Sequence, residues 1–320
     1  MSLLAVTIAF LRSTDFWIGV GILISTYGIL ALGLQLNLGT TGIANFGAAG
    51  FMAIGAYAMG ILVVKAHLSF WLAMVLGVLV AIAAAIVVGL PSLRLRADYF
   101  AIATLAFAEI TRYLIDPLHT ITAGHEGLIG YDTTWLRMSI RMSRWLHSVG
   151  IDASFLLPLM LVSWGIFLLL VIGFWLLNKT PWARVLRAIR EDEDAAAALG
   201  KNTLVCKLQS LSLAAAVAAI AGYIFALNVT ILVPETFDPV ISIFGYLVII
   251  LGGLGSYWGV IFGAVLLLTM MEGTRFLGLP LPDEKVAALR FLIVGLILIA
   301  LMAFRPQGVF GKRDEMILGD

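Results

Sequence analysis

Long apolar runs separated by short polar breaks dominate the pattern of the chain. They lie at residues 17–36, 42–64, 69–91, 99–116, 154–177, 204–227, 240–254, 257–274 and 287–304. A helix needs about 20 mostly apolar residues to cross the hydrocarbon core of a membrane, whereas a strand of a membrane barrel needs only about 10. The run lengths therefore predict an all-α, polytopic membrane protein with about eight to ten transmembrane helices.

The pattern is interrupted near its end by the glycine-rich segment GGLGS at 252–256. The apolar stretch that contains it, 240–274, is too long for one membrane span and short for two. Because glycines break helices, the stretch is predicted to form a hairpin of short or re-entrant helices. The four-residue spacing of Gly255, Gly259 and Gly263 favours tight helix packing.

A second glycine-rich region, NLGTTGIANFGAAGFMAIGAYAMG, covers residues 37–60. Small residues let helix backbones approach closely, and glycines with amides also tolerate an unwound stretch that lines a cavity. Both interpretations stay open. If the stretch is unwound and lines a cavity, the candidates for a translocation path are Asn37, Asn45 and Gly47. Gly252 and Gly253 of the other glycine-rich region are further candidates.

The composition supports a single membrane domain over residues 1–320. Apolar residues make up 62% of the chain, charged residues only 12%, and the mean hydropathy is +1.06. A soluble domain carries about a quarter charged residues. The net charge of +1 gives no reason to expect nucleic acid, and the single Cys206 excludes an intrachain disulfide and a thiolate metal cluster. Residues 1–12 lack a basic start and a cleavage-like site, so an uncleaved interfacial segment is expected.

Basic residues assign the two sides of the membrane. One side has Arg94, Arg96, Lys179, Arg184, Arg187, Arg190, Lys201, Lys207, Arg305, Lys312 and Arg313, which are 11 of the 20 lysines and arginines. This excess of positive charge predicts that the side is cytoplasmic. The long loop at 117–153 is then external.

The external loop contains TTWLRMSIRMSRWLHS at residues 133–148. At helical spacing one face has Trp135, Met138, Met142 and Trp145, and the opposite face has Arg137, Arg141 and Arg144. The alternation also fits a strand, but a helix in the membrane interface is preferred because tryptophans favour headgroup level. Two roles stay open: membrane anchoring, or docking of an acidic external protein on the three arginines.

Residues suited to catalysis or to phosphate binding are sparse. All four histidines fall in predicted external loops, no HExxH occurs, and no GxxxxGK[ST] phosphate loop is present. The chain is therefore predicted to be non-catalytic, without a cofactor or a metal. If ATP drives transport, it is expected to bind to another chain.

Charges inside the apolar runs are few. Glu109 and Arg112 lie at i, i+3 in one run, and Glu272 and Arg275 repeat this spacing near the end of another. An ionisable group in a span costs about 3 kcal/mol or more and normally faces protein or water. Pairing within each helix is favoured over substrate contact. Glu109 nevertheless remains a candidate for the translocation path.

The most charged stretch, RAIREDEDAAAALG, lies at 187–200 on the predicted cytoplasmic side. Thr180 with Pro181 forms a helix start and Gly200 a helix stop, so one amphipathic helix is predicted over 181–199. Its apolar side is expected to contain Val185, Leu186, Ile189, Ala196 and Leu199.

The order of charges on this predicted helix is unfavourable for the helix itself. Arg187 with Glu191, and Arg190 with Asp194, would pair at i, i+4 with the base first, and the arginines lie toward the positive end of the helix dipole. Recognition of a protein partner explains such a surface better. The candidate contact residues are Arg184, Arg187, Arg190, Glu191, Asp192, Glu193, Asp194 and Gly200.

Five segments, spread in order along nearly the whole chain, resemble the LivM-type permease subunits of branched-chain amino acid ABC importers. They are NLGTTGIANFGAAGFMAIGAY (37–57), LRLRADYFAIATLAFAEITR (93–112), TPWARVLRAIREDEDAAAALGKN (180–202), ILGGLGSYWGVIFGA (250–264) and FRPQGVFG (304–311). DAAAALG (194–200) resembles the EAAxxxG motif of importer permeases, with aspartate in place of glutamate. TAGHEG (122–127) departs from the TGGxxG of relatives.

The resemblance implies an importer of two permeases and two ATP-binding subunits, fed by an external substrate-binding protein. This chain would be one permease in the bacterial cytoplasmic (inner) membrane, in contact with lipid and with a second homologous, LivH-like permease. Its charged cytoplasmic helix would couple to the ATPases, and its cargo would be branched-chain or other neutral amino acids. Urea or short amides are the first alternative cargo, and a stand-alone secondary carrier is the less favoured alternative class.

Overall fold

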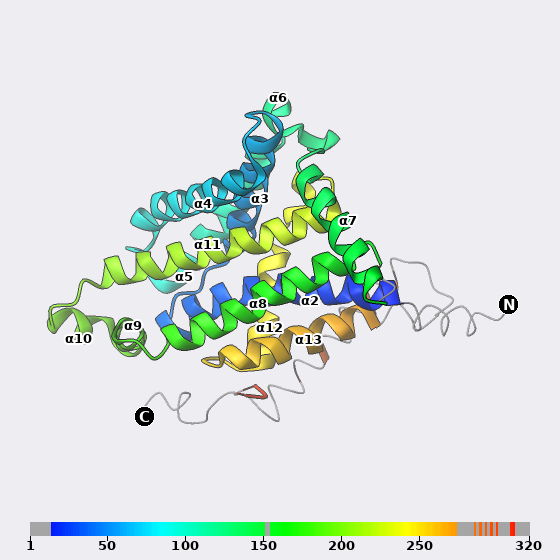
Figure 1. The fold of residues 1–320 in the computed structure, drawn as a ribbon. Coiled ribbons are helices and arrows are strands. Elements are labelled where there is room, and N and C mark those ends of the chain that lie inside the picture. The colour runs from blue at the N-terminus through cyan, green and yellow to red at the C-terminus, as the bar shows by residue number, and fades with distance from the viewer. Residues whose placement is uncertain are drawn as a thin grey trace.

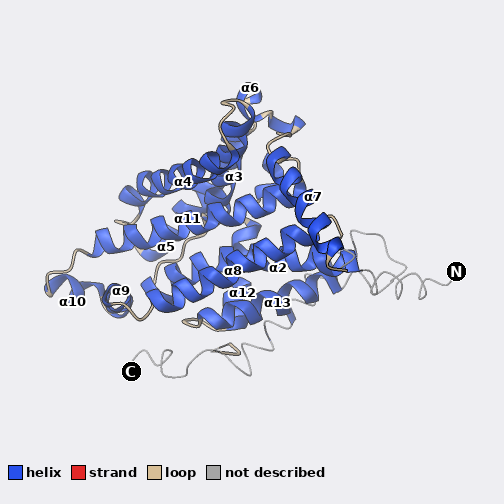
Figure 2. Cartoon of the chain, viewed as in Figure 1, coloured by secondary structure: helices blue, strands red, loops and turns tan. Residues whose placement is uncertain are grey.

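The computed structural model describes residues 14–150, 154–273 and 308–310, with single positions at 285, 288, 289, 292, 295, 296 and 299. The segment 1–12, most of the run at 287–304, and Arg275, Arg305, Lys312 and Arg313 lie outside these residues. The described chain is helical without strands, apart from an isolated β-bridge between Leu128 and Leu232 (Figure 2). The prediction of an all-α membrane protein is confirmed.

Eight of the predicted apolar runs form helices. These are α2 (Thr14–Leu34), continued by the π-helix η1 (Gln35–Thr41), then α3 (Ala48–Val64), α4 (Phe70–Ser92), α5 (Ala97–Ile115), α8 (Leu157–Leu177), α11 (Thr203–Val229), α12 (Val240–Gly252) and α13 (Tyr257–Gly273). Five stretches have the length and hydropathy of a membrane span: Thr14–Thr41, Phe70–Ser92, Leu157–Leu177, Thr203–Val229 and Pro234–Gly252. Helices α3 and α13 are apolar but shorter.

Shorter elements connect these helices. The predicted external loop contains α6 (His119–Thr122), the 3-10 helix η2 (Gly124–Glu126) and α7 (Thr133–Ser148). The charged segment forms α9 (Pro181–Glu191) and α10 (Glu193–Ala198), and the 3-10 helix η3 (Pro234–Phe237) precedes α12. In Figure 1, α9 and α10 lie at the left of the bundle and α7 at its right, as expected for elements on opposite sides of a membrane.

Helices α2 and α11 lie in the centre of the bundle, and α4 and α8 lie toward its outside (Figure 1). Buried residues make up 78% of the apolar windows of the two central helices but 28% of those of α4 and α8. Helix α11 packs against α2, α3 and α4, and α2 also packs against α8, α12 and α13. The exposed side chains of α4 and α8 are apolar, such as Val87 and Leu169, so they suit contact with lipid.

Small residues allow the central helices to approach closely. A methyl group on Gly55 of α3 would lie 2.5 Å from Cα of Ala219 on α11. A methyl group on Gly222 of α11 would lie 2.3 Å from the carbonyl oxygen of Met52 on α3. The glycine-rich region at 37–60 therefore does serve tight helix packing, at least in the part that forms α3.

The predicted hairpin at 240–274 is confirmed. Helices α12 and α13 pack along each other, and a methyl group on Gly263 would lie 2.1 Å from the carbonyl oxygen of Val248. Gly252 and Gly259 approach each other equally closely. Gly255 is not part of this packed face, because it lies in the turn with a φ of +82°.

The helix predicted at 133–148 is also confirmed, as α7. Its buried face has Ser139 and Leu146, with Trp135 and Met142 half-buried, whereas Trp145 is exposed. All three arginines of this helix are exposed on the opposite face.

Candidate functional site

The first component of the site is a break between α2 and α3. Helix α2 widens into the π-turn η1, and Gly42 then adopts a φ of +79°, a left-handed conformation that favours glycine. Residues 42–46 leave the helix before α3 begins at Ala48. The glycine-rich region therefore contains an unwound stretch as well as a packing surface.

Side chains from several helices satisfy the backbone and hydroxyl groups of this broken segment. The backbone N–H groups of Phe46 and Ala49 donate to Thr104 Oγ1 on α5 (3.0 Å) and to Ser242 Oγ on α12 (2.9 Å). The hydroxyl group of Thr40 bonds to Tyr257 on α13 (2.9 Å). Non-helical backbone at membrane depth is tolerated where protein groups satisfy it in this way.

Asn37 and Asn45 lie inside this network and are almost fully buried. Asn37 Oδ1 accepts a hydrogen bond from Ser210 Oγ on α11 (3.1 Å), while its Nδ2 is buried without a hydrogen-bond partner in the described residues. Asn45 Oδ1 accepts from the backbone N–H of Gly47 (2.9 Å). Both asparagines thus shape the broken segment.

The other path candidates lie apart from these two. Gly252 and Gly253 end α12 and are buried, and Gly308 packs against Gly253. Glu109 lies on α5, and its side chain is 39% exposed. The structure therefore groups Asn37, Asn45 and Gly47 in one segment, whereas the remaining three candidates lie in other elements.

The charged segment forms two helices, so the prediction of one helix over 181–199 is wrong. Thr180 caps α9 as predicted, but the backbone of Asp192 is extended, with φ −152° and ψ 106°. The Asp192 carboxylate accepts a hydrogen bond from the backbone N–H of Ala195 (2.9 Å) and so caps α10. Glu193 and Asp194 then occupy the first turn of α10, where the helix dipole favours acids. Part of the acidic run is explained by this second helix start.

Two arginines of α9 are directed toward the transmembrane helices. Arg187 Nη1 donates to the side-chain oxygen of Asn178 (2.5 Å), next to the end of α8, and also to its carbonyl (3.1 Å). Arg190 donates to the carbonyl of Gly39 in η1 and pairs with Glu191 (3.1 Å). The predicted i, i+4 pairs of Arg187 with Glu191 and of Arg190 with Asp194 are therefore not formed. Arg184 is exposed.

The outward surface of α10 is small and mostly apolar. Leu199 was expected on the buried side but is 82% exposed, with Ala195, Ala197 and Ala198 exposed beside it. Leu186, Ile189 and Ala196 are buried as expected. Glu193 forms an ion pair with Lys207 of α11, which ties α10 to the bundle.

A cavity of about 280 Å³ lies where α9 meets the broken segment. It is lined by Thr41, Gly42, Ile43, Ala44, Leu93, Leu95, Arg96, Ala97, Phe100, Ile189, Arg190, Glu193 and Lys207. The lining thus combines the unwound backbone with the α4–α5 connection and with α9, α10 and α11. A movement of α9 would change its shape.

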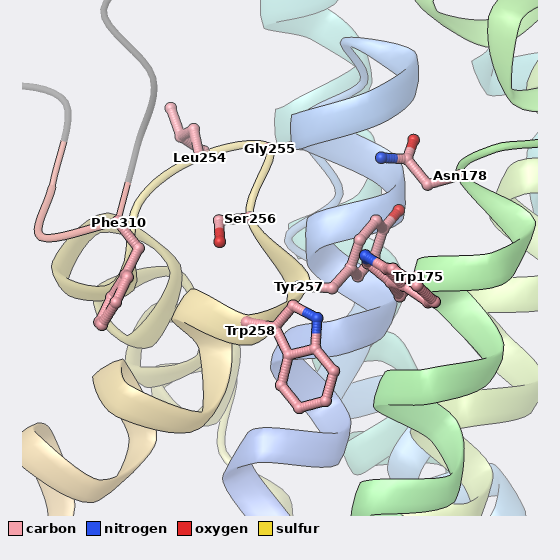
Figure 3. Close-up of a pocket in the computed structure, with 8 residues that line it drawn as sticks. All are labelled: Trp175, Asn178, Leu254, Gly255, Ser256, Tyr257, Trp258 and Phe310. Carbon is pink, nitrogen blue, oxygen red and sulfur yellow. The ribbon is translucent and has the colours of Figure 1, made fainter.

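A second cavity, of about 240 Å³, lies between the end of α8 and the α12–α13 turn. Figure 3 shows Trp175 and Asn178 on one side of it and Phe310 on the other. The backbone N–H of Phe310 donates to the carbonyl of Gly252 (3.0 Å). Asn178 also accepts the hydrogen bond from Arg187, so this cavity adjoins a contact that holds α9 to the end of α8.

The predicted ion pair between Glu109 and Arg112 is formed. Glu109 Oε2 accepts from Arg112 Nε (3.0 Å) and Nη2 (2.8 Å). The guanidinium carbon also lies 4.6 Å from the centre of the Tyr113 ring. Glu272 is 7% exposed, and its expected partner Arg275 lies outside the described residues.

The end of the bundle near α6, η2 and η3 has contacts that sequence reasoning missed. His125, in the TAGHEG segment, bridges Asp116 at the end of α5 (2.9 Å) and Glu235 of η3. The hydroxyl group of Tyr131 donates to the carbonyl of Ala226 (2.7 Å), and burial raises the pKa of this tyrosine, which keeps the donor protonated. Only the polar composition of this loop pointed to such contacts.

Comparisons with known proteins agree with these features. A family model described as the permease component of the branched-chain amino acid transport system matches residues 17–302. The high-affinity branched-chain amino acid transport system permease protein LivM of Salmonella typhimurium is 35% identical over 298 residues, covering 88% of this chain and 67% of that protein. Its Escherichia coli counterpart is 34% identical with the same coverage. A probable LivM permease of Methanocaldococcus jannaschii is 26% identical, covering 90% and 91%. No solved structure matches the chain.

Proposed function

This chain belongs to the family of branched-chain amino acid transport system permeases, and from that premise we propose that it imports branched-chain or other neutral amino acids. It is a multi-pass membrane protein and a permease subunit of an ATP-driven ABC importer. Its relatives are named as transport permeases, which fits a non-catalytic subunit. We place it in the bacterial cytoplasmic membrane, with ATP hydrolysis in separate subunits.

One observation carries the proposed mechanism: Arg190 of α9 donates to the carbonyl of Gly39 in the broken segment. A cytoplasmic helix that is bonded to unwound backbone inside the bundle can transmit a displacement to it. An ATPase that moves α9 and α10 would thereby shift the segment containing Asn37, Asn45 and Gly47, which we assign to the translocation path. Gly252, Gly253 and Glu109 are assigned to the same path from α12 and α5.

The residues assigned to coupling fall into two groups, those that face the bundle and those that face outward. Arg187 and Arg190 connect α9 to the bundle, and Asp192 and Gly200 bound α10. The outward-facing residues are left to contact the ATP-binding subunits, and we assign that role to Arg184, Glu191, Asp194 and the apolar patch of Ala195, Ala197, Ala198 and Leu199. Glu193 pairs with Lys207 of α11 and supports this surface by holding α10 to the bundle. Such a patch, with charges at its edge, has the composition of a small docking surface.

We place the second, LivH-like permease against the outward face of α5. This helix carries three charges, Asp98, Glu109 and Arg112, and it lacks the hydropathy of the five candidate spans in the described part of the chain. Charges on a lipid-exposed face are costly, so a protein or an aqueous path beside α5 is favoured. The path would then run between the two permeases.

We assign the contact with the external substrate-binding protein to α7. Arg137, Arg141 and Arg144 are exposed on one face of this helix, whereas the opposite face packs on the bundle. Three like charges on an exposed helix suit an acidic surface of a substrate-binding protein.

Reconstitution tests the proposal. The chain, its partner permease and the ATPases would be placed in liposomes with the binding protein, and uptake of radiolabelled L-leucine measured with and without ATP. ATP-dependent uptake is expected. Uptake of urea or acetamide but not of amino acids would assign the alternative cargo, and uptake by this chain alone under an ion gradient would identify a secondary carrier.

A further inference from the structure

We infer that Glu109 and Arg112 of α5 bind the charged groups of a zwitterionic amino acid as it crosses the membrane. The inference rests on the proposed function and gives this pair a role beyond pairing with each other. The carboxylate of Glu109 would receive the ammonium group of the substrate, and the guanidinium of Arg112 would receive its carboxylate.

The position of the pair is the first argument. An α-helix rises about 1.5 Å per residue, so Glu109 lies about 18 Å along the axis from the start of α5 at Ala97, and about 9 Å from its end at Ile115. With the side of α9 and α10 taken as cytoplasmic, the pair lies in the half of α5 that is nearer to its external end. A substrate delivered from outside would reach this level early.

The exposure of the pair is the second argument. The Glu109 and Arg112 side chains are 39% and 21% exposed, and they are surrounded by exposed apolar side chains such as Ile110. In lipid, this exposure would leave both charges poorly solvated. An i, i+3 pair on the surface of a helix contributes too little to stability to offset that cost. The pair is therefore best explained by a polar occupant outside this chain.

The hydrogen bonds show which atoms remain for such an occupant. Both bonds from Arg112 end on the same oxygen, Oε2 of Glu109. Oε1 of Glu109 has no hydrogen bond in the described residues, and Nη1 of Arg112 makes none to Glu109. An unbonded acceptor, Oε1 of Glu109, thus lies beside a guanidinium whose other contact is the Tyr113 side chain.

This arrangement matches the chemistry of an amino acid. The ammonium and carboxylate groups of a zwitterion are separated by one carbon, and an adjacent acid and base can bind both with charge-assisted hydrogen bonds. The exposed side chains of Leu105 and Ile110 lie on the same helix and offer apolar contact to a hydrocarbon side chain. Urea and simple amides carry no formal charges and would gain little from such a pair.

Two double variants separate this role from a structural one. Glu109→Gln with Arg112→Gln removes both charges with little change of shape, and Glu109→Arg with Arg112→Glu restores a pair in reversed order. If the pair only stabilises α5, both variants should transport normally, and the neutral one should be at least as stable. If it binds the zwitterion, ATP-dependent uptake of L-leucine per assembled complex should fall about tenfold or more in both, because charge-assisted bonds are lost or reversed.

A milder variant tests the same role if the double variants fail to fold. Glu109→Asp keeps the charge but draws the carboxylate back, so we expect a raised KM for L-leucine with most of the maximal rate retained. Wild-type uptake by either double variant, or an unchanged KM for Glu109→Asp, would overturn the inference.

The outcome for the wild-type complex separates this inference from the proposed function. If the wild-type complex takes up L-leucine and the neutral double variant does so equally well, only the role of the pair is lost. If the wild-type complex takes up acetamide or urea but no amino acid, the proposed function itself is wrong.

Discussion

The guanidinium of Arg190 donates a hydrogen bond to the carbonyl of Gly39, a residue 151 positions earlier in the chain. The donor belongs to the amphipathic helix α9 and the acceptor to the π-turn that continues α2. The side chain of Arg190 is only 20% exposed, and Gly42 packs directly against it. The contact therefore joins the surface assigned to the ATPases with the segment assigned to the path.

Replacement of Arg190 should uncouple ATP hydrolysis from uptake. Arg190→Gln loses the charged bond to the Gly39 carbonyl, and a hydrogen bond from a charged group contributes about 1.5–3 kcal/mol. We expect the number of L-leucine molecules taken up per ATP to fall about tenfold in proteoliposomes. Arg94→Gln is the matched control, because Arg94 is an exposed arginine in the α4–α5 connection and is not assigned to coupling. Equal loss in both variants would contradict a specific role for Arg190.

The α12–α13 hairpin should be sensitive to one added methyl group. In Gly263→Ala the new Cβ would lie 2.1 Å from the carbonyl oxygen of Val248, so the two backbones must move apart. We expect a loss of about 1–3 kcal/mol, seen as a lower Tm of the purified chain in detergent. Gly165→Ala on α8 meets no atom within 4 Å and should leave the Tm unchanged or raise it. A Tm for Gly263→Ala as high as that control would refute the close packing.

The exposed end of α10 should matter for partners and not for folding. Leu199 is 82% exposed, so Leu199→Ser is expected to leave the Tm of the isolated chain unchanged. If this patch docks the ATPases, their recovery in co-purification should fall several-fold. Val149→Ser is the control, since Val149 is 60% exposed at the end of α7. Undiminished recovery with Leu199→Ser would remove α10 from the docking surface.

Charge reversal on α7 should weaken the interaction with the substrate-binding protein in a salt-dependent manner. Changing Arg137, Arg141 and Arg144 together to glutamate replaces attraction by repulsion toward an acidic partner. We expect weaker stimulation of transport by the binding protein, most visibly at low ionic strength, because salt screens exposed charges. Lys65→Glu serves as the control, because it reverses one exposed charge that follows α3 and lies outside α7. Stimulation that does not depend on salt in the wild type would argue against electrostatic docking.

The pattern of the sequence predicted the elements that depend on local physics. Apolar runs of spanning length became helices, GGLGS became the turn of a hairpin, and residues 133–148 became a helix. The resemblance to LivM-type permeases, based on five segments in order, was confirmed by the family match over residues 17–302. These features depend on hydrophobicity, glycine and residue order, which can be read without coordinates.

The charged segment shows the limit of such reasoning. Spacing along one helix predicted that Arg187 and Arg190 pair with acids four positions ahead, and that Leu199 is buried. Instead, Asp192 starts a second helix, which turns Leu199 outward. At Asp192 the chain could continue the first helix, or the aspartate side chain could bond to the backbone and start a new one. Sequence spacing alone does not decide between these two outcomes.

By itself, then, the sequence determined that the chain is a bundle of membrane helices with a glycine-rich segment at 37–60 and one highly charged segment at 187–200. It left open whether the glycine-rich segment packs or unwinds. Only the tertiary structure decided that Arg190 reaches Gly39 and that Glu109 and Arg112 lie on an outward face. The physical reason is that helix formation in a membrane follows from local hydrophobicity and backbone bonding. The partner of a polar side chain, in contrast, depends on which distant helices pack beside it.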